Sequence, residues 1–527
     1  MKNLHTVFLF MTFTFSVNAQ ITFQKTFGGT NIDGGNSVLQ TSDGGFIIAG
    51  LTKSFGAGDL DNYLLKTDAN GNVQWKKTCG NSFYDYSNAL APAANGGYLA
   101  TGITASYGNG VYLSSLKTDA DGNTVYYKTI GAVDGYSATY DVQQTSDGGY
   151  VFSGTTYGVD TISIDHVYVV KTNSNSDTLW TMMLENRENG MQMWQDVAYG
   201  IKETSDGGYI VAVSSGSYLT QMNNAMLVRL NSSGTPQWAK TYGGPADDVV
   251  RYVYQTPDGG FLAAGTTRSF GAGGADFYLV KTDASGTLQW SKTYGGTSDE
   301  GLLAFSETSD GGYIACGTTL SFGSGSEDVY LVKINSTGDT VWTKTYGGAS
   351  YESGVAVQQT TDGGYIITGA TQSFGQGNRD LYLIKTDANG NSGCNEGGFQ
   401  TITGNPTSTE GSHTTVFKRG GAIALQTDAT ANAGGIPNTI CSVTDVDDLP
   451  SEKTLVIFPN PGKGIFNINC DEPILEITIF NLLGEKVMEF QVENNAAKIN
   501  LSQHQNGMYS AIIKTKDNYF TQKIMVE

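Results

Sequence analysis

The sequence predicts an all-β protein built from one repeated unit, and three observations support this prediction. Glycine occupies 69 of the 527 positions, and charged residues make up only 15% of the chain, where about 25% is typical. Tyrosine occurs 29 times and is the commonest aromatic residue, which favours strands over helices. A turn that contains two adjacent glycines also recurs at a nearly constant spacing.

The recurring turn defines the repeat. The residue before the glycine pair falls at positions 43, 95, 147, 206, 258, 310 and 362, so five steps are 52 residues long and one is 59. Each period contains four strand-like stretches, which in the fifth copy are 249–256, 261–267, 277–281 and 288–294. Four strands per unit is typical of a propeller blade, and the glycines supply the positive φ of a tight hairpin. Residues 20–393 are therefore predicted to form a seven-bladed β-propeller.

The two ends of the repeat predict that the blades close into a ring. The last copy has three strands and then reaches Cys394 in place of a fourth. Residues 21–29 precede the first copy and resemble the fourth strand at 288–296. We expect them to complete the seventh blade, because this pairing removes the open sheet edges.

An Asp-x-x-Gly-x-x-x-Trp pattern links the third and fourth strands, as in Asp283, Gly286 and Trp290. It resembles the tryptophan-docking repeats of quinoprotein-type propellers, although it is one residue shorter between Asp and Gly. The resemblance implies that the indole packs between neighbouring blades. It implies no quinone cofactor, since the repeat count is seven rather than eight and the sequence has no adjacent cysteine pair. Two copies differ, with Tyr126 in place of Trp and Ser176 in place of Gly.

The N-terminus has the features of a signal peptide. Residues 1–19 combine Lys2, an apolar run and small residues at positions 17 and 19. No other stretch approaches 18 consecutive apolar residues, so we expect no membrane-spanning helix and export of the whole chain. Export permits a disulfide, and Cys394 and Cys441 are the candidate pair. They bracket a segment rich in Gly, Thr, Ser and Asn, so residues 394–448 are interpreted as a linker, with some strand content around 414–426.

From residue 449 the repeats stop, and short alternating strands indicate a second, small β domain over 449–527. Its landmarks occur in a fixed order: Pro459, Asn460, Pro461, Gly464, Gly484, Gly507 and Tyr509. These motifs resemble the type A C-terminal sorting domain of the Bacteroidota type IX secretion system. The resemblance implies a β-sandwich that engages the secretion machinery and carries the protein across the outer membrane. The protein would then be secreted or attached to the cell surface.

In six copies, an acidic residue stands ten positions before the residue that precedes the glycine pair. These residues are Asp33, Asp85, Asp196, Asp248, Glu300 and Glu352, with Ser137 in the remaining copy. A second set lies in the loop after the second strand: Asp61, Asp276, Asp328 and Asp380. Propeller topology places both sets on one face, as an acidic double ring at the channel mouth. The carboxylates could bind Ca²⁺, with Asp33, Asp85, Asp196 and Asp248 as candidate ligands, or a basic partner; alternatively, each caps a turn.

The same loops hold an aromatic residue in six copies, and it stands beside glycine in five of them. These rings could stack on sugars or pack between blades. The long third period adds an enlarged loop at 185–194, which includes Arg187, Met191, Met193 and Trp194. Because an interruption of a repeat often serves function, this loop is the candidate contact site. The alternative is an insertion that folds over its own blade.

The composition narrows the function classes. A net charge of −20 argues against nucleic acid. Four histidines and no nucleophile–base pair at a recognisable spacing argue against catalysis. We predict an exported, non-catalytic module for binding or adhesion to a glycan or protein, with no certain cofactor beyond possible Ca²⁺. The alternative is an extracellular polysaccharide lyase or glycosidase that uses the carboxylates at the channel mouth.

Overall fold

The computed structural model describes residues 20–526 apart from several short segments and one long one. These gaps are 94–95, 107–109, 132–134, 158–164, 189–190, 193–194, 217–221, 399–400, 407, 412–413, 420–426, 429–454, 459–461, 471–472, 482–485, 493, 505 and 516–518. The expected signal peptide at 1–19 and Cys441 lie outside the described residues. The chain divides into two compact units, Met1–Val446 and Asp447–Glu527.

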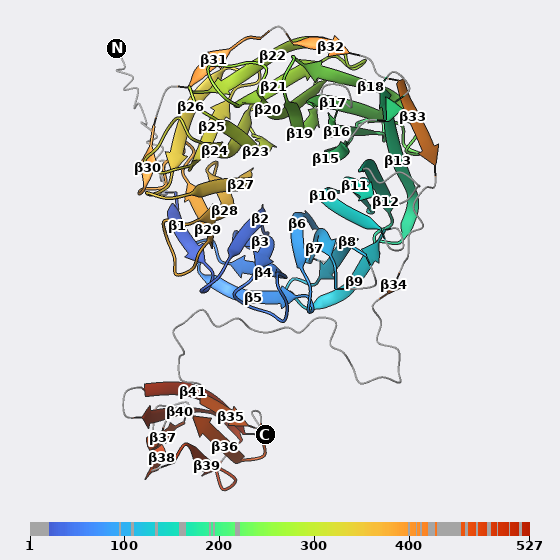
Figure 1. Cartoon of the computed structure of the whole chain (residues 1–527). Coiled ribbons are helices and arrows are strands. Elements are labelled where there is room, and N and C mark those ends of the chain that lie inside the picture. Colours follow the sequence, from blue (N-terminus) through green and yellow to red (C-terminus); the bar gives the residue numbers. More distant parts are fainter. Residues whose placement is uncertain are drawn as a thin grey trace, which may run out of the picture. The chain divides into compact units, whose positions relative to one another are not determined.

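The first unit is a ring of seven antiparallel sheets, or blades (Figure 1). Six blades are built on four strands that follow one another in sequence, and the seventh combines three such strands with the N-terminal strand β1. Blades 1 and 2 are β2 (Asp33–Gln40), β3 (Phe46–Thr52), β4 (Asp61–Thr67), β5 (Val73–Cys79) and β6 (Asp85–Pro92), β7 (Tyr98–Thr104), β8 (Tyr112–Thr118), β9 (Thr124–Ile130). Blades 3 and 4 are β10 (Tyr136–Gln144), β11 (Tyr150–Tyr157), β12 (His166–Thr172), β13 (Thr178–Glu188) and β15 (Gln195–Glu203), β16 (Tyr209–Gly216), β17 (Asn223–Leu230), β18 (Pro236–Gly243).

Blades 5 to 7 continue the same pattern. They are β19 (Asp248–Gln255), β20 (Phe261–Thr267), β21 (Asp276–Thr282), β22 (Leu288–Gly295); β23 (Glu300–Glu307), β24 (Tyr313–Thr319), β25 (Asp328–Ile334), β26 (Thr340–Tyr346); and β27 (Glu352–Gln359), β28 (Tyr365–Thr371), β29 (Asp380–Thr386) with β1 (Phe23–Phe27). The first strand of each blade lines the centre of the ring, and the fourth lies at the rim (Figure 1). The predicted all-β propeller is therefore confirmed.

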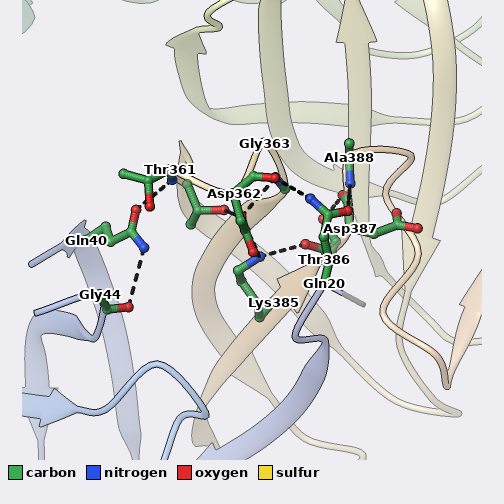
Figure 2. A network of polar contacts seen from close by, with 12 residues as sticks. Gln20, Gln40, Gly44, Thr361, Asp362, Gly363, Lys385, Thr386, Asp387 and Ala388 are labelled. Atoms are coloured by element: carbon green, nitrogen blue, oxygen red, sulfur yellow. Dashed lines mark hydrogen bonds and ion pairs between the residues drawn. The ribbon is translucent and has the colours of Figure 1, made fainter. Parts of the chain in front are cut away.

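The ring closes through the N-terminal strand. β1 pairs antiparallel with β29, with Phe23 opposite Lys385 and Lys25 opposite Leu383. Polar contacts reinforce this junction (Figure 2): the Thr361 amide donates to Gln40 Oε1 at 2.8 Å, and the Ala388 amide donates to Gln20 Oε1 at 3.0 Å. Blade 7 is thus held by both ends of the repeat region.

The glycines have the conformations that the repeat requires. The first glycine of each Asp-Gly-Gly turn has positive φ, for example 81° at Gly259. The Asp side chain of the turn also holds a buried cation from the third strand. Lys281 Nζ lies 2.9 Å from Asp258 Oδ2 and donates to the Thr282 carbonyl at 2.9 Å. The same ion pair recurs in five other blades: Lys66–Asp43, Lys171–Asp147, Arg229–Asp206, Lys333–Asp310 and Lys385–Asp362.

The tryptophans pack between blades, as the docking resemblance implies. A Cβ placed on Gly338 of blade 6 would lie 2.8 Å from the Trp290 ring of blade 5, so the indole rests directly on this glycine. The same contact joins Trp75 to Gly122, Trp180 to Gly234, Trp238 to Gly286 and Trp342 to Gly390, with Phe23 on Gly71. Close backbone approach explains the glycine at this position.

The segment expected to be a linker differs from that expectation. Five short strands between residues 396 and 428 run backwards around the rim and add a fifth strand to five successive blades (Figure 1). These strands are β30 (Glu396–Gly397) on β26, β31 (Ile402–Gly404) on β22, β32 (Thr409–Gly411) on β18, β33 (Thr414–Arg419) on β13 and β34 (Thr427–Asp428) on β9. We call them the belt. The open rim edges of the blades explain it, since unpaired strand edges favour the addition of an extended chain.

The second unit contains two antiparallel sheets. One consists of β35 (Leu455–Phe458), β36 (Ile465–Cys470) and β39 (Ala496–Asn500), and the other of β38 (Lys486–Gln491), β37 (Ile474–Phe480), β40 (Gly507–Thr515) and β41 (Tyr519–Val526). Phe466 and Ile499 of the first sheet share one buried core with Ile477 and Ile513 of the second. The unit is therefore a small sandwich, as predicted.

Candidate functional site

The acidic residues that begin the first strands are buried and hydrogen-bonded. Asp33, Asp85, Asp248, Glu300 and Glu352 are all 0% exposed, and Asp196 is 2% exposed. Glu300 Oε1 accepts from Thr319 Oγ1 at 2.7 Å, and its Oε2 accepts from the Gly296 amide at 2.6 Å. Asp248 has the same arrangement, with Ser269 Oγ and the Gly244 amide each donating to Oδ2 at 2.7 Å. These contacts match the turn-capping interpretation.

The second acidic set is also buried, since Asp61, Asp276, Asp328 and Asp380 are at most 2% exposed. Asp328 Oδ2 accepts from the amides of Ser324 and Gly325, both at 3.0 Å. Both sets therefore lie inside the blade junctions, where a partner at the surface does not reach them.

The two acidic sets meet between neighbouring blades. A Cβ on Gly295 would collide with both Asp276 Oδ1 of blade 5 and Glu300 Oε2 of blade 6. Burial, and then the charge of Glu300, raise the pKa of Asp276 to about 7. Burial also raises the pKa of Asp61 to about 6. The hydrogen bond from the Gly58 amide lowers this pKa, and the charge of Asp85 raises it further. These carboxyl groups titrate far above their ordinary range.

The described residues contain no group of three or more His, Cys, Asp or Glu side chains arranged to hold a metal ion. Asp33, Asp85, Asp196 and Asp248 lie on four different blades. Binding of Ca²⁺ by any of them stays a prediction.

The described loop aromatics, Phe55, Phe270, Phe322 and Phe374, pack within the ring, whereas Tyr107 and Tyr218 lie outside the described residues. Phe270 lies 6.1 Å from the ring of Tyr278, and Phe322 lies 5.5 Å from Tyr330. A Cβ on Gly244 would lie 2.9 Å from Phe270, so this ring also covers the end of the preceding blade. The packing alternative therefore describes these rings.

The enlarged loop is described only in its backbone. β13 extends to Glu188 and turns back into β14 (Met191–Gln192), with Arg187 opposite Gln192. Met193 and Trp194 lie outside the described residues. The role of this loop in partner binding stays a prediction, as does the disulfide, for which Cys394 is exposed.

The centre of the ring contains a cavity of about 180 Å³ lined by residues from the first strands of all seven blades. Its lining is asymmetric. Blades 1, 2, 6 and 7 contribute small, amide and aliphatic side chains together with one Phe, whereas blades 3 to 5 contribute Tyr140, Tyr199, Tyr252 and Tyr254 with Asp141 and Lys202. The aromatic side lies where the repeat is least regular.

Five tyrosines and one arginine lie on or beside the first half of the first strands of blades 2 to 5. Tyr140 and Tyr199 lie 4.9 Å apart, and the Arg251 guanidinium lies 4.6 Å from the centre of the Tyr199 ring. Tyr86 and Tyr136 interact electrostatically with Tyr140, and Tyr84 interacts with Tyr136. We call Tyr84, Tyr86, Tyr136, Tyr140, Tyr199 and Arg251 the tyrosine cluster. All six side chains are partly exposed.

The tyrosine cluster rests on polar residues deeper in the channel. Lys202 Nζ lies 3.2 Å from Asp141 Oδ2 and 5.7 Å from the Tyr254 ring. Tyr252 and Tyr254 donate to the carbonyls of Leu303 and Phe305, at 2.8 and 3.0 Å. Burial raises the pKa of Tyr136 to about 12, so this phenol stays a protonated donor at neutral pH. The cluster presents ring faces, hydroxyl donors and a guanidinium, which are groups that bind sugars or peptides.

The sequence patterns considered above did not point to the tyrosine cluster. A signal was present at the fourth position of the first strands, which reads Asn36, Asn88, Tyr140, Tyr199, Arg251, Leu303 and Val355. This position changes from blade to blade, whereas the scaffold positions repeat. Variation within a repeat marks residues that the scaffold does not require.

The structure of the second unit describes part of the sorting motif. Gly464 has φ 80°, and a Cβ on it would meet the backbone of Ser502 at 2.6 Å. Gly507 begins β40, and Tyr509 is buried in the core of the sandwich. Pro459, Asn460, Pro461 and Gly484 lie outside the described residues. In the described part of the chain, no helix is long and apolar enough to cross a membrane.

Solved structures with a related shape include propellers at very low identity. Sqt1 from Chaetomium thermophilum is 10% identical, covering 70% of this chain and 99% of that chain with a TM-score of 0.39. YCF48 bound to D1 peptide is 10% identical over 69% and 95%, with a TM-score of 0.37. PorZ, described as a surface component of the type-IX secretion system of Porphyromonas gingivalis, is 8% identical over 96% and 100%, with a TM-score of 0.19.

No curated protein matches the chain. Residues 456–527, by contrast, match the family model of the secretion system C-terminal sorting domain. This match covers the sandwich and includes the motifs from Pro459 to Tyr509. The C-terminal unit is therefore a type IX secretion sorting domain, which directs the protein to the cell surface or the medium through the secretion machinery.

Proposed function

We propose that the exported propeller is a non-catalytic module that binds a glycan or protein partner at the tyrosine cluster. One observation carries this proposal: the partly exposed Tyr140 and Tyr199 rings pack against each other in the channel, and the Arg251 guanidinium lies over the Tyr199 ring. Stacked aromatic faces with adjacent hydroxyls bind sugar rings and peptide side chains at a small entropic cost, because few torsions must be fixed.

The surroundings of the tyrosine cluster support the proposal. In sequence, the enlarged loop 185–194 joins blade 3 to blade 4, the two blades whose first strands carry Tyr140 and Tyr199. Both features interrupt the repeat in the same blades. An export signal also calls for a function outside the cell, where glycans and surface proteins are the available partners.

The alternative enzyme would need two accessible carboxyl groups across a sugar ring. Asp248, Glu300 and Glu352 are buried and accept two or more hydrogen bonds each. Their geometry favours a structural role and therefore supports the binding module over the lyase or glycosidase.

A glycan array and a screen against surface proteins, both with the full exported chain, test the proposal. We expect binding that is lost in Tyr140→Ala and kept in Tyr157→Ala, which removes an exposed tyrosine outside the tyrosine cluster. Turnover of a polysaccharide that disappears in Asp248→Asn or Glu300→Gln would contradict the proposal and favour the enzyme. Binding that survives Tyr140→Ala would place the site elsewhere.

A further inference from the structure

The buried acidic residues form a repeated arrangement that binding at the channel mouth does not use. In each blade, the first or second residue of the first strand and that of the third strand lie opposite the same hydroxyl residue of the second strand. Asp248 and Asp276, for example, lie opposite Thr267. The third-strand residue then meets the first-strand residue of the next blade. Four junctions have an acid on both sides: Asp61 with Asp85, Asp276 with Glu300, Asp328 with Glu352 and Asp380 with Asp33.

The two members of a pair have different surroundings. Glu300 accepts hydrogen bonds from Thr319 Oγ1, the Gly296 amide and the Ser321 amide, at 2.6 to 3.2 Å. These donors stabilise its charged form. Asp276 Oδ1 is buried, has no hydrogen-bond partner among the described residues and faces Glu300 Oε2. An uncompensated carboxylate at this place would be costly, because it is buried beside a second negative charge.

We propose that the Asp276–Glu300 pair binds one proton at neutral pH, with Asp276 as the protonated partner that donates to the charged Glu300. A protonated Asp276 gives Oδ a hydrogen to donate and also removes the like-charge repulsion. The junction between blades 5 and 6 is thus closed by an acid–carboxylate hydrogen bond. The acids of the other three pairs are placed in the same way.

The remaining three junctions supply an internal comparison. At the register position of Asp276, blade 4 has Asn224, blade 3 has His166 and blade 2 has Tyr112. None of these residues needs to carry a negative charge, and Asn has the shape of a protonated Asp. Where the first-strand acid itself is replaced, by Ser137, the third-strand residue is Tyr112. The chain therefore never places an obligatory second negative charge at a junction.

The other charged and titratable groups near the Asp276–Glu300 pair leave this assignment intact. Asp299 is a further negative neighbour, and it is itself held by Arg268 at 3.1 Å and by the Ala275 amide at 2.8 Å. Tyr330 is the neighbouring phenol, and burial raises its pKa far above neutral. Burial and Glu300 raise the pKa of Asp276 to about 7, in agreement with the geometry.

As a consequence, the propeller should be more stable against unfolding in mild acid than in mild alkali. The native state binds more protons than the unfolded state between the ordinary pKa of Asp, near 4, and the folded value near 7. The stability that the Asp276–Glu300 pair contributes is therefore fully present below about pH 4, and it is lost as the pH rises through about 7.

Thermal unfolding of the full chain and three substitutions test the proposal. Asp276→Asn replaces the proton donor by an amide donor, so we expect a higher Tm at pH 8, by about 2 °C, and little change at pH 5. Glu300→Gln removes the charged acceptor and should lower the Tm at both pH values. Asn224→Asp adds a fifth pair beside Asp248 and should lower the Tm at pH 8 more than at pH 5. Asp121→Asn, on an exposed hairpin, is the control and should change neither.

A direct readout separates a proton from a metal ion. The infrared carbonyl band of protonated carboxyl groups at pH 7 should weaken in Asp276→Asn and remain in Asp121→Asn. A lower Tm of Asp276→Asn at pH 8, similar to that of Glu300→Gln, would overturn the proposal. So would calorimetric binding of Ca²⁺ to the full chain at pH 7 that disappears in Asp276→Asn, because the pair would then hold a cation.

Discussion

Two junctions of the ring hold neighbouring blades together by different contacts: the junction between blades 5 and 6 and the junction between blades 2 and 3. In the first, Trp290 packs on Gly338, and Tyr294 donates to the Gly338 carbonyl at 2.5 Å. In the second, Tyr126 replaces the tryptophan and exchanges a 2.8 Å hydrogen bond with Ser176. Ser176 adopts φ 58°, which is rare for a residue with a side chain. The first junction depends on packing, and the second on hydrogen bonds.

The two junctions also differ in the partner of the third-strand lysine. Blade 5 holds Lys281 on Asp258, whereas Lys117 of blade 2 donates to the Ser174 carbonyl of blade 3 at 3.0 Å. Blade 2 has Asn95 in the turn position of Asp258. The tyrosine cluster and the enlarged loop lie in this irregular part of the ring. A repeat protein can thus lose some of its repeated contacts at one junction, provided that neighbouring residues make other contacts in their place.

Removal of the packed indole should have the largest effect. Trp290→Ala takes away a ring wedged between two blades, and we expect a loss of about 3 kcal/mol of unfolding free energy. Tyr126→Phe removes only a hydroxyl at the other junction and should cost about 1 kcal/mol. Denaturant unfolding of the full chain measures both. Equal losses would contradict the distinction between a packed and a hydrogen-bonded junction.

Loss of the ion pair in the hairpin turn should have the next largest effect on stability, and this effect should depend on pH. Lys281 is nearly buried, so Asp258→Asn leaves its charge poorly compensated and should cost about 2 kcal/mol. Hydrogen bonds from Thr256 and Lys281 lower the pKa of Asp258 to about 2. Its contribution is present above the ordinary Asp pKa and is lost as the pH falls through about 2. The acid limb of the unfolding profile should therefore flatten in Asp258→Asn.

Lys117 provides the matched control for this ion pair. Because Lys117 contacts a carbonyl rather than a carboxylate, Lys117→Met should cost less than Lys281→Met at pH 7. It should also leave the acid limb unchanged. A similar acid dependence in the two variants would indicate that blade 2 has an equivalent carboxylate partner.

A combined exchange tests whether the two junction types are alternatives. Tyr126→Trp alone should destabilise the fold by about 1 kcal/mol, because the larger ring meets the Ser176 side chain and loses its hydrogen bond. Adding Ser176→Gly should recover most of the loss, since the pair then matches Trp290 and Gly338. A double-mutant cycle measures this coupling. Additive effects would show that the two positions do not act together.

The sequence predicts the blades well because their pattern is local and periodic. The hairpin glycines, the docking pairs such as Trp290 and Gly338, and the placement of residues 21–29 all follow from spacing. The acidic positions were also found. They were placed in a double ring at the channel mouth, whereas they lie in buried junctions and match the turn-capping alternative. Asp276 alone does not reveal its burial, which depends on a glycine of one blade and an acid of the next.

The belt could not be predicted for a different reason. Its strands are two to six residues long, and they bind through the backbone to edges that lie more than 100 residues away for most blades. Such strands need no hydrophobic period, so Gly and Thr-rich composition looked like a linker. The tyrosine cluster was missed because its members come from four blades and none belongs to the repeated pattern.

The smallest expected effect concerns how the belt compensates the weaker junction. β33 pairs six residues with β13 of blade 3, whereas β31 pairs three residues with β22 of blade 5. The longest belt strand thus lies on a blade that lacks the regular docking glycine. A chain that ends after residue 411 keeps β31 and loses β33, so hydrogen exchange should accelerate in β13 and change little in β22. Faster exchange in β22 as well would mean that the belt stabilises the ring as a whole, because loss of one strand would then loosen blades that it does not touch.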